Sequence, residues 1–184
     1  MVMDEEYYTA GEKEFLLKIA MKSLEKFLLS GEKFEPQTIN KKLWEKKAVF
    51  VTLNLDNKLR GCMGNIEPIE SLILSVRNNV LLAANDPRFN PLKTNELKSI
   101  EIEISILSKL QLATVDSINY GDGVLVKRGN NFATYLPSVW KNLKEKNVFL
   151  SSLCEKAGLE NDLCHDPETK FWIYRATSFK LSKS

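Results

Sequence analysis

The stretch Ile100-Glu101-Ile102-Glu103-Ile104-Ser105-Ile106 carries the clearest strand signal in the chain. Apolar and polar residues alternate through it without a break. Successive side chains of a strand point to opposite faces, so one face of this segment packs on a core and the other meets water. A sheet with one solvated face is typical of antiparallel pairing, because parallel sheets are covered on both sides. The stretch therefore predicts a half-buried strand in an antiparallel sheet.

Further strands are predicted on both sides of this segment. Asp56-Asn57 and Gly129-Asn130 are turn signals between runs rich in β-branched and aromatic residues, and each predicts a hairpin. The predicted strands are residues 48–55 with 58–63, residues 123–127 with 131–136, and residues 170–181 as a last strand.

Three segments repeat their apolar residues with helical period. Thr9 and Glu12 have capping-box spacing before the first helix, and Gly31 ends it. Pro68 suits the first turn of the second helix, which stops before Pro87, because the residue before a proline resists the helical region. The third helix is marked by Val148, Phe149, Leu153 and Ala157 and is closed by Gly158. Helices at irregular intervals between antiparallel strands indicate an α+β fold, a mostly antiparallel sheet with flanking helices.

Composition limits the class of protein. The 184 residues are 43% apolar and 27% charged, which is typical of a soluble globular protein. The acidic N-terminus lacks the regions of a signal peptide, and no apolar run has membrane-spanning length. A net charge of +2 gives no field that requires nucleic acid or an anionic membrane. We therefore expect a cytoplasmic protein that binds no membrane.

The cysteines predict neither a disulfide framework nor a metal site. Cys62, Cys154 and Cys164 are odd in number and contain no C-x-x-C pair, so we expect reduced thiols. A zinc site that combines them with His165, the only histidine, lacks a chelating spacing. His165 is a weak candidate for a base beside Cys62, and Gly121-Asp122-Gly123 lacks the rest of a dinucleotide fingerprint. We expect no metal and no cofactor.

The hexapeptide Leu59-Arg60-Gly61-Cys62-Met63-Gly64 is the strongest candidate site. In an extended chain, side chains i and i+2 share a face about 7 Å apart, so Arg60 and Cys62 are expected to point the same way. A nearby cation favours the thiolate, which is the reactive form of cysteine. Gly61 and Gly64 permit unusual dihedrals and close approach of a ligand or another chain. The alternative is that Cys62 is a small, buried strand residue.

Asp86 and Arg88 complete this candidate site. We expect Arg60, Cys62, Asp86 and Arg88 to line one cleft, where the N-terminus of the helix near Pro68 would favour an anion. The predicted ligand is an anionic small molecule or a peptide carboxylate. The alternative for Asp86 and Arg88 is an ordinary ion pair at a helix stop. The alternative for Arg60 is an ion pair with Glu67, Glu70 or Asp86.

Residues 40–47 combine lysines with Trp44, a pattern that nucleic-acid-binding proteins use. Acidic residues nearly cancel the basic ones over the whole chain. We therefore favour a solvated face with Trp44 packed on the core, and nucleic-acid binding is the weaker hypothesis.

The chain resembles the AMMECR domain family. The hexapeptide is similar to the family hallmark L-R-G-C-I-G, with Met63 in place of isoleucine. Further similar segments are, in order, residues 48–53, 86–92, 101–107, 136–140, 153–159 and Tyr174-Arg175. The resemblance spans residues 11–181 after a tail of residues 1–10, and implies a single α+β domain with a larger and a smaller lobe. It also implies a functional link to Memo-like and radical S-adenosylmethionine proteins, which microbes often encode beside the domain.

Two functions from different classes follow. The first is a binding, adaptor or accessory module with a ligand cleft near the hexapeptide, for a small anionic ligand or a protein partner. The second is a cysteine-dependent enzyme that acts on an anionic small molecule through Arg60 and Cys62. A nucleophile needs an activating base, and no residue of the sequence pattern matches Cys62 in that role, which favours the first function.

Overall fold

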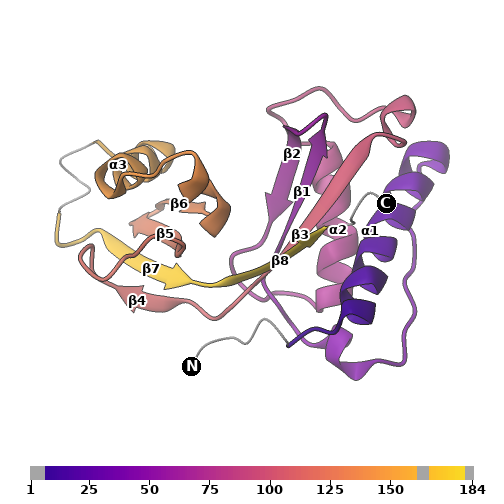
Figure 1. The fold of residues 1–184 in the computed structure, drawn as a ribbon, viewed down its shortest axis with the longest axis horizontal. Helices are drawn as coiled ribbons and strands as arrows, with labels where there is room; N and C mark the ends of the chain where they lie inside the picture. The colour runs from indigo at the N-terminus through magenta and orange to yellow at the C-terminus, as the bar shows by residue number, and fades with distance from the viewer. Residues whose placement is uncertain (1–6, 161–165, 181–184) are drawn as a thin grey trace. The chain divides into compact units, whose positions relative to one another are not determined.

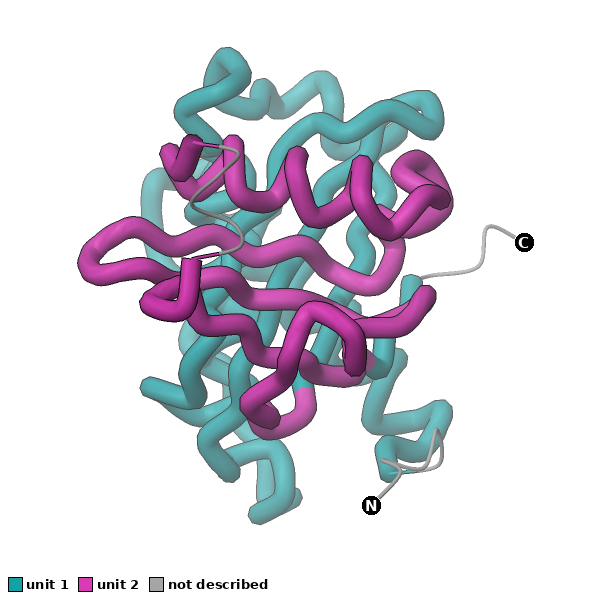
Figure 2. Tube along the Cα trace, turned by 90° about the vertical axis from the view of Figure 1, so that its left-hand side faces the viewer, with its two compact units in different colours: residues 1–107, 177–184 teal, residues 108–176 magenta. Residues whose placement is uncertain are grey.

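The computed structural model describes residues 7–160 and 166–180. The chain divides into two compact units, which Figure 2 shows in different colours. Unit 1 comprises residues 1–107 and 177–184, and unit 2 comprises residues 108–176. Each unit has a four-stranded sheet and its own cluster of buried apolar side chains. The predicted α+β class is confirmed.

Unit 1 is a sheet with two helices packed on one face (Figure 1). Its elements are α1 (Ala10–Ser30), β1 (Val49–Leu55), β2 (Lys58–Gly64), α2 (Leu72–Ala84), β3 (Ile100–Leu107) and β8 (Ala176–Lys180). The strand order is β2-β1-β3-β8, and β1 pairs antiparallel with both β2 and β3. Residues 100–106, predicted as a half-buried strand of an antiparallel sheet, therefore belong to an inner strand of this sheet.

The core of unit 1 lies between the sheet and the helices. Val49, Val51 and Leu53 of β1 are fully buried, whereas the residues between them are half-buried. Ile104 pairs with Val51 and Ile102 with Leu53, and all four belong to the cluster that contains the apolar faces of α1 and α2. Because paired residues of neighbouring strands point to the same side, the polar positions of β1 and β3 share the opposite face.

The two ends of α1 are where the sequence predicted them. The N–H of Glu12 donates to the Thr9 hydroxyl, the Glu12 carboxylate accepts the N–H of Thr9, and Gly31 ends the helix with a φ of 72°. Burial acts to raise the pKa of Glu12, but hydrogen bonds outweigh it and lower the pKa to about 2. Tyr8 is buried, so the packed part of unit 1 includes residues that were predicted to be a tail.

α2 begins at Leu72 after Ser71, and the prediction of a start at Pro68 was wrong. The N–H of Leu72 donates to the carbonyl of Glu45 at 2.8 Å, and the N–H of Lys47 donates to the carbonyl of Glu70 at 3.3 Å. These bonds hold the chain before Leu72 against residues 45–47. The helix therefore starts only after this contact ends.

Unit 2 has a second antiparallel sheet. Its elements are β4 (Gln111–Ala113), β5 (Gly123–Arg128), β6 (Asn131–Tyr135), α3 (Lys146–Lys156) and β7 (Lys170–Tyr174), in the strand order β4-β7-β5-β6. Trp140 stacks on Phe149 of α3 with ring centroids 3.8 Å apart. The Trp140 indole donates to the carbonyl of Asp122 at 2.8 Å, so the polar tip of this buried side chain is satisfied.

Three predictions for this part of the chain were wrong or incomplete. Residues 170–181 were predicted as one strand, but β7 and β8 belong to different sheets and are separated by Arg175. β4 has three residues, too few to show an alternating pattern, and was not predicted. Cys154 is buried and disulfide-bonded, so the expectation of reduced thiols fails there.

Candidate functional site

Cys62 lies on the face of the unit 1 sheet that points away from the helices. It pairs with Thr52 of β1, and Thr52 pairs with Glu103 of β3. Directly paired residues point to the same face, so these three residues form a row across three strands, here called the Cys62 row. The Thr52 hydroxyl donates to the Cys62 Sγ at 3.3 Å. Cys62 is half-buried, so part of its side chain is exposed.

Gly61 and Gly64 serve close packing. Neither has a positive φ, so the expectation of unusual dihedrals was wrong. A Cβ at Gly61 would lie 2.1 Å from the carbonyl oxygen of Ala83, near the end of α2. A Cβ at Gly64 would lie 2.4 Å from the ring Cγ of Phe50 and 2.5 Å from the carbonyl oxygen of Val49. The group that approaches each glycine is thus another part of the same chain.

Asp86 connects the loop after α2 to β2, at the outer edge of the sheet. Its side chain is 2% exposed, and its Oδ2 accepts the backbone N–H of Cys62 at 2.9 Å. The Arg88 guanidinium donates to the same carboxylate from Nη2 at 2.6 Å and from Nε at 3.0 Å. These hydrogen bonds from Arg88 hold the pKa of Asp86 well below its usual range, although burial opposes them. The ion pair that was predicted as an alternative for Asp86 and Arg88 is confirmed.

Arg88 presents a fixed cation near Cys62. Its side chain is 55% exposed, and its Nη1 has no hydrogen-bond partner in the described part of the chain. The hydrogen bonds to Asp86 are the main cause of the raised pKa of Arg88, and the electrostatic interaction with Cys62 adds to the shift. The guanidinium and the Cys62 N–H both donate to Asp86 Oδ2, which places Arg88 beside Cys62.

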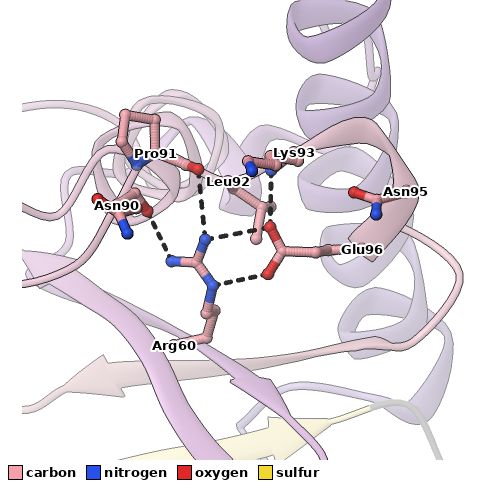
Figure 3. Close-up of a pocket in the computed structure, with 7 residues that line it drawn as sticks. All are labelled: Arg60, Asn90, Pro91, Leu92, Lys93, Asn95 and Glu96. Carbon is pink, nitrogen blue, oxygen red and sulfur yellow. Dashed lines mark hydrogen bonds and ion pairs between the residues drawn. The ribbon is translucent and has the colours of Figure 1, made fainter.

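Arg60 is engaged elsewhere. Its Nε and Nη2 donate to the two carboxylate oxygens of Glu96 at 2.7 and 3.1 Å, and its Nη1 donates to the carbonyl of Asn90 at 2.9 Å (Figure 3). Glu67, Glu70 and Asp86 were the predicted ion-pair partners, and this prediction was wrong. The hydrogen bonds from Arg60 also lower the pKa of Glu96.

The groove around Arg60 does not include Cys62. It has a volume of about 710 Å³ and is lined by Arg60, Asn90, Pro91, Leu92, Lys93, Asn95 and Glu96. Cys62, Asp86 and Arg88 are not among its lining residues. The expectation that Arg60 lines one cleft with these three residues therefore has no support from the described groove, and Arg60 holds the loop before β3 against β2.

The helix N-terminus that was expected at this site is also elsewhere. Gly61 packs against Ala83, so the C-terminal end of α2 lies beside the hexapeptide. The helix has 13 residues and is about 20 Å long at 1.5 Å per residue, which places its N-terminus far from Gly61. The carbonyl end of a helix carries partial negative charge and favours cations, so it suits Arg88 and would not attract an anion by itself.

The remaining candidates contribute little to this site. Within residues 7–160 and 166–180 there is no group of three histidine, cysteine, aspartate or glutamate side chains that could hold a metal ion. Cys164 and His165 lie outside the described residues. Trp44 is 42% exposed and donates from its indole to the carbonyl of Thr38, so it is not packed in the core as expected. The nucleic-acid hypothesis for residues 40–47 stays untested.

Sequence reasoning missed Thr52 and Glu103. The alternation in residues 100–106 placed Glu103 on the polar face of its strand. Nothing in the sequence showed that Glu103 and Cys62 would flank the same residue of β1, because that depends on the register of two pairings. A one-residue slip in either pairing would have put the carboxylate beside other residues.

Comparison with known proteins identifies relatives along nearly the whole chain. Residues 17–179 match the AMMECR1 family. A protein of Methanopyrus kandleri is 36% identical over 95% of this chain and 91% of its own length. A protein of Nanoarchaeum equitans is 38% identical over 90% of this chain and 98% of its own length. The crystal structure of an uncharacterized protein from Pyrococcus horikoshii matches with a TM-score of 0.87 and 34% identity, over 91% of this chain and 90% of that chain. Among the described residues, no helix is long and apolar enough to span a membrane.

Proposed function

This chain belongs to the AMMECR1 family, and we propose that it is a binding or accessory module that takes an anionic group beside Cys62. The proposed site consists of Arg88, Cys62 and Thr52. The proposed compartment is the cytoplasm. The pathway is one shared with Memo-like and radical S-adenosylmethionine proteins, as the family resemblance implies.

The observation that carries the proposal is the way Asp86 presents Arg88. The buried carboxylate takes one edge of the guanidinium, through Nε and Nη2, and leaves Nη1 with open N–H groups on a half-exposed side chain. A guanidinium binds carboxylates and phosphates through charge-assisted hydrogen bonds. Because Asp86 already holds the arginine in place, binding costs little further side-chain entropy.

A cysteine-dependent enzyme acting on an anionic small molecule is the second candidate. The Thr52 hydroxyl donates to the Cys62 Sγ, and the Arg88 guanidinium shares the Asp86 carboxylate with the Cys62 N–H, so a hydroxyl and a cation lie beside the thiol. Catalysis would also require a base in contact with the thiol or the substrate. Binding of an anion requires only the groups already in place, and it is therefore the function that the geometry supports best.

Thermal shift with a panel of carboxylates, phosphates and S-adenosylmethionine-related compounds tests the proposal. At least one compound should raise Tm, because a ligand at about 100 times its Kd stabilises the folded state by about 2.7 kcal/mol. Arg88→Gln should abolish this ligand-induced shift, and Arg88→Lys should weaken it, because lysine keeps the charge without the fork of donors. Lys18→Gln removes an exposed cation of α1 and should leave the shift unchanged. A panel without a stabiliser, or a stabiliser indifferent to Arg88→Gln, would refute the assignment.

A further inference from the structure

β3 carries polar residues on the face that points away from the helices, and two of them are already paired. The Oγ atoms of Ser105 and Ser178 are 2.8 Å apart, and Glu101 forms an ion pair with Lys180 at 3.8 Å. Glu103 lies between Glu101 and Ser105 and is half-buried. Within residues 7–160 and 166–180 the Glu103 carboxylate forms no hydrogen bond or ion pair. A carboxylate partly removed from water without a counter-charge is unfavourable, so Glu103 is suited to a cationic group from outside unit 1.

The position of this carboxylate relates it to the proposed anion site. Thr52 lies between Cys62 and Glu103 in the Cys62 row. Neighbouring strands are about 4.8 Å apart, so Cys62 and Glu103 are about 10 Å apart across the sheet. Arg88 is at the Cys62 end, because its guanidinium and the Cys62 N–H bind the same Asp86 carboxylate. The row therefore has a cation beyond one end and an anion at the other, with a thiol and a hydroxyl between them.

We infer that the ligand of this site is a zwitterion with an extended chain between its two charges. Its anionic group binds Arg88, its ammonium group binds Glu103, and Cys62 and Thr52 contact the chain between them. This inference rests on the proposed function for the anionic end and adds the cationic end. A simple anion would leave Glu103 without a counter-charge, and a dianion would place like charges together, so both are selected against.

A series of ω-amino carboxylates of increasing length tests the inference. The probes are ω-aminobutyrate, ω-aminohexanoate and ω-aminooctanoate, each compared by calorimetric titration with the plain carboxylate of the same chain length. One amino carboxylate should bind about tenfold more tightly than its plain counterpart, which corresponds to about 1.4 kcal/mol. The dicarboxylate of that length should bind more weakly than the plain carboxylate.

Two matched variants locate the cationic end. Glu103→Gln keeps the shape of the side chain and removes its charge, and it should make the amino and plain carboxylates bind equally. Glu101→Gln removes a carboxylate from the same face of the same strand, at a position already paired with Lys180, and should keep the tenfold preference. Glu103→Asp retains the charge and should keep part of the preference, which controls for a general effect of substitution at this position. Thermal unfolding of each variant shows that it is folded.

The outcomes separate this inference from the proposed function. Equal binding of amino and plain carboxylates to the native chain would overturn the zwitterion and leave the anion site standing. A preference that survives Glu103→Gln would show that the ammonium group binds elsewhere. If no anion binds at all, the proposed function fails together with the inference.

Discussion

Gly61→Ala would add one methyl group where β2 lies close against the end of α2. The new Cβ would lie 2.1 Å from the carbonyl oxygen of Ala83 and 3.1 Å from the carbonyl carbon. Favourable separations of non-bonded carbon atoms are about 3.5–4.0 Å, so the strand and the helix must move apart. The obstructing atoms belong to the backbone, and no side-chain rotation can relieve the overlap.

We expect this substitution to lower the free energy of unfolding by about 3 kcal/mol, the upper end of the usual cost of overpacking. Movement of α2 would also stretch the 2.9 Å hydrogen bond from the Cys62 N–H to Asp86, and such a bond contributes about 1 kcal/mol. The lower entropy of the unfolded alanine chain opposes the loss by about 0.4–1 kcal/mol. Cys62→Ala removes a small thiol and the hydrogen bond from Thr52, and should cost only about 1 kcal/mol.

Urea unfolding followed by circular dichroism gives these free energies, and hydrogen exchange at the amides of β2 places the loss in unit 1. Gly11→Ala is the matched control. Nothing lies within 4 Å of a Cβ at Gly11, which is in α1, so this variant should be as stable as the native chain or more stable by up to about 1 kcal/mol. An unchanged urea midpoint for Gly61→Ala, or a loss no larger than that of Cys62→Ala, would show that the contact with Ala83 does not limit residue 61.

Three further predictions concern the carboxylates that hold this region together. Asp86→Ala should lower the free energy of unfolding in urea by about 1–3 kcal/mol more than Asp86→Asn, because the asparagine side chain still accepts the Cys62 N–H. Equal losses in the two variants would show that this hydrogen bond does not contribute to stability. Since the pKa of Asp86 is lowered by folding, the unfolded chain takes up the proton first as the pH falls below about 4. Stability should therefore fall with pH in that range, and less steeply in Asp86→Asn, as acid titration of Tm would show. Arg60→Lys should lower the free energy of unfolding by about 1–2 kcal/mol, because the two hydrogen bonds to Glu96 are lost. It should leave any Tm shift that an anion causes through Arg88 unchanged. Loss of that shift would show that Arg60 belongs to the binding site.

Local features of this chain were readable from the sequence because local chemistry determines them. The turn Asp56-Asn57 predicted the hairpin, and both residues have the positive φ that a tight hairpin turn requires. The capping box at Thr9 and the glycine at Gly31 fixed the ends of α1. Each of these features involves residues within a few positions of one another, so no knowledge of the tertiary fold was needed.

The partner of Arg60 depends on the tertiary fold, and the prediction failed there. Glu96 lies 36 residues further along the chain, whereas two of the three proposed partners were within ten positions of Arg60. The register of β1 and β2 shifts between Leu53 and Asn54, which leaves Arg60 as the extra residue of a bulge. A bulge interrupts the alternation of side chains, so the rule that residues i and i+2 share a face does not carry from Cys62 to Arg60.

The hexapeptide divides between structural and ligand-facing roles, and this division decides where function should be sought. Gly61 packs on α2, Met63 packs against the core of unit 1, and Arg60 holds Glu96. Cys62 is the one member of the hexapeptide that belongs to the row with Thr52. Gly64 packs on Phe50 and Val49 of β1. Four members of the hexapeptide therefore make contacts within unit 1, and the motif serves mainly the folding of this unit.

The residues that would distinguish one ligand from another then lie outside the motif. Arg88 and Glu103 supply the charges at the two ends of the Cys62 row, and neither belongs to the hexapeptide. Substitutions at Gly61 or Arg60 are expected to reduce stability, and any loss of binding would follow from that. Substitutions at Arg88 and Glu103 are expected to change which ligand binds while the Gly61 contact with α2 stays intact. A set of variants confined to the hexapeptide would therefore miss the residues that determine ligand selectivity.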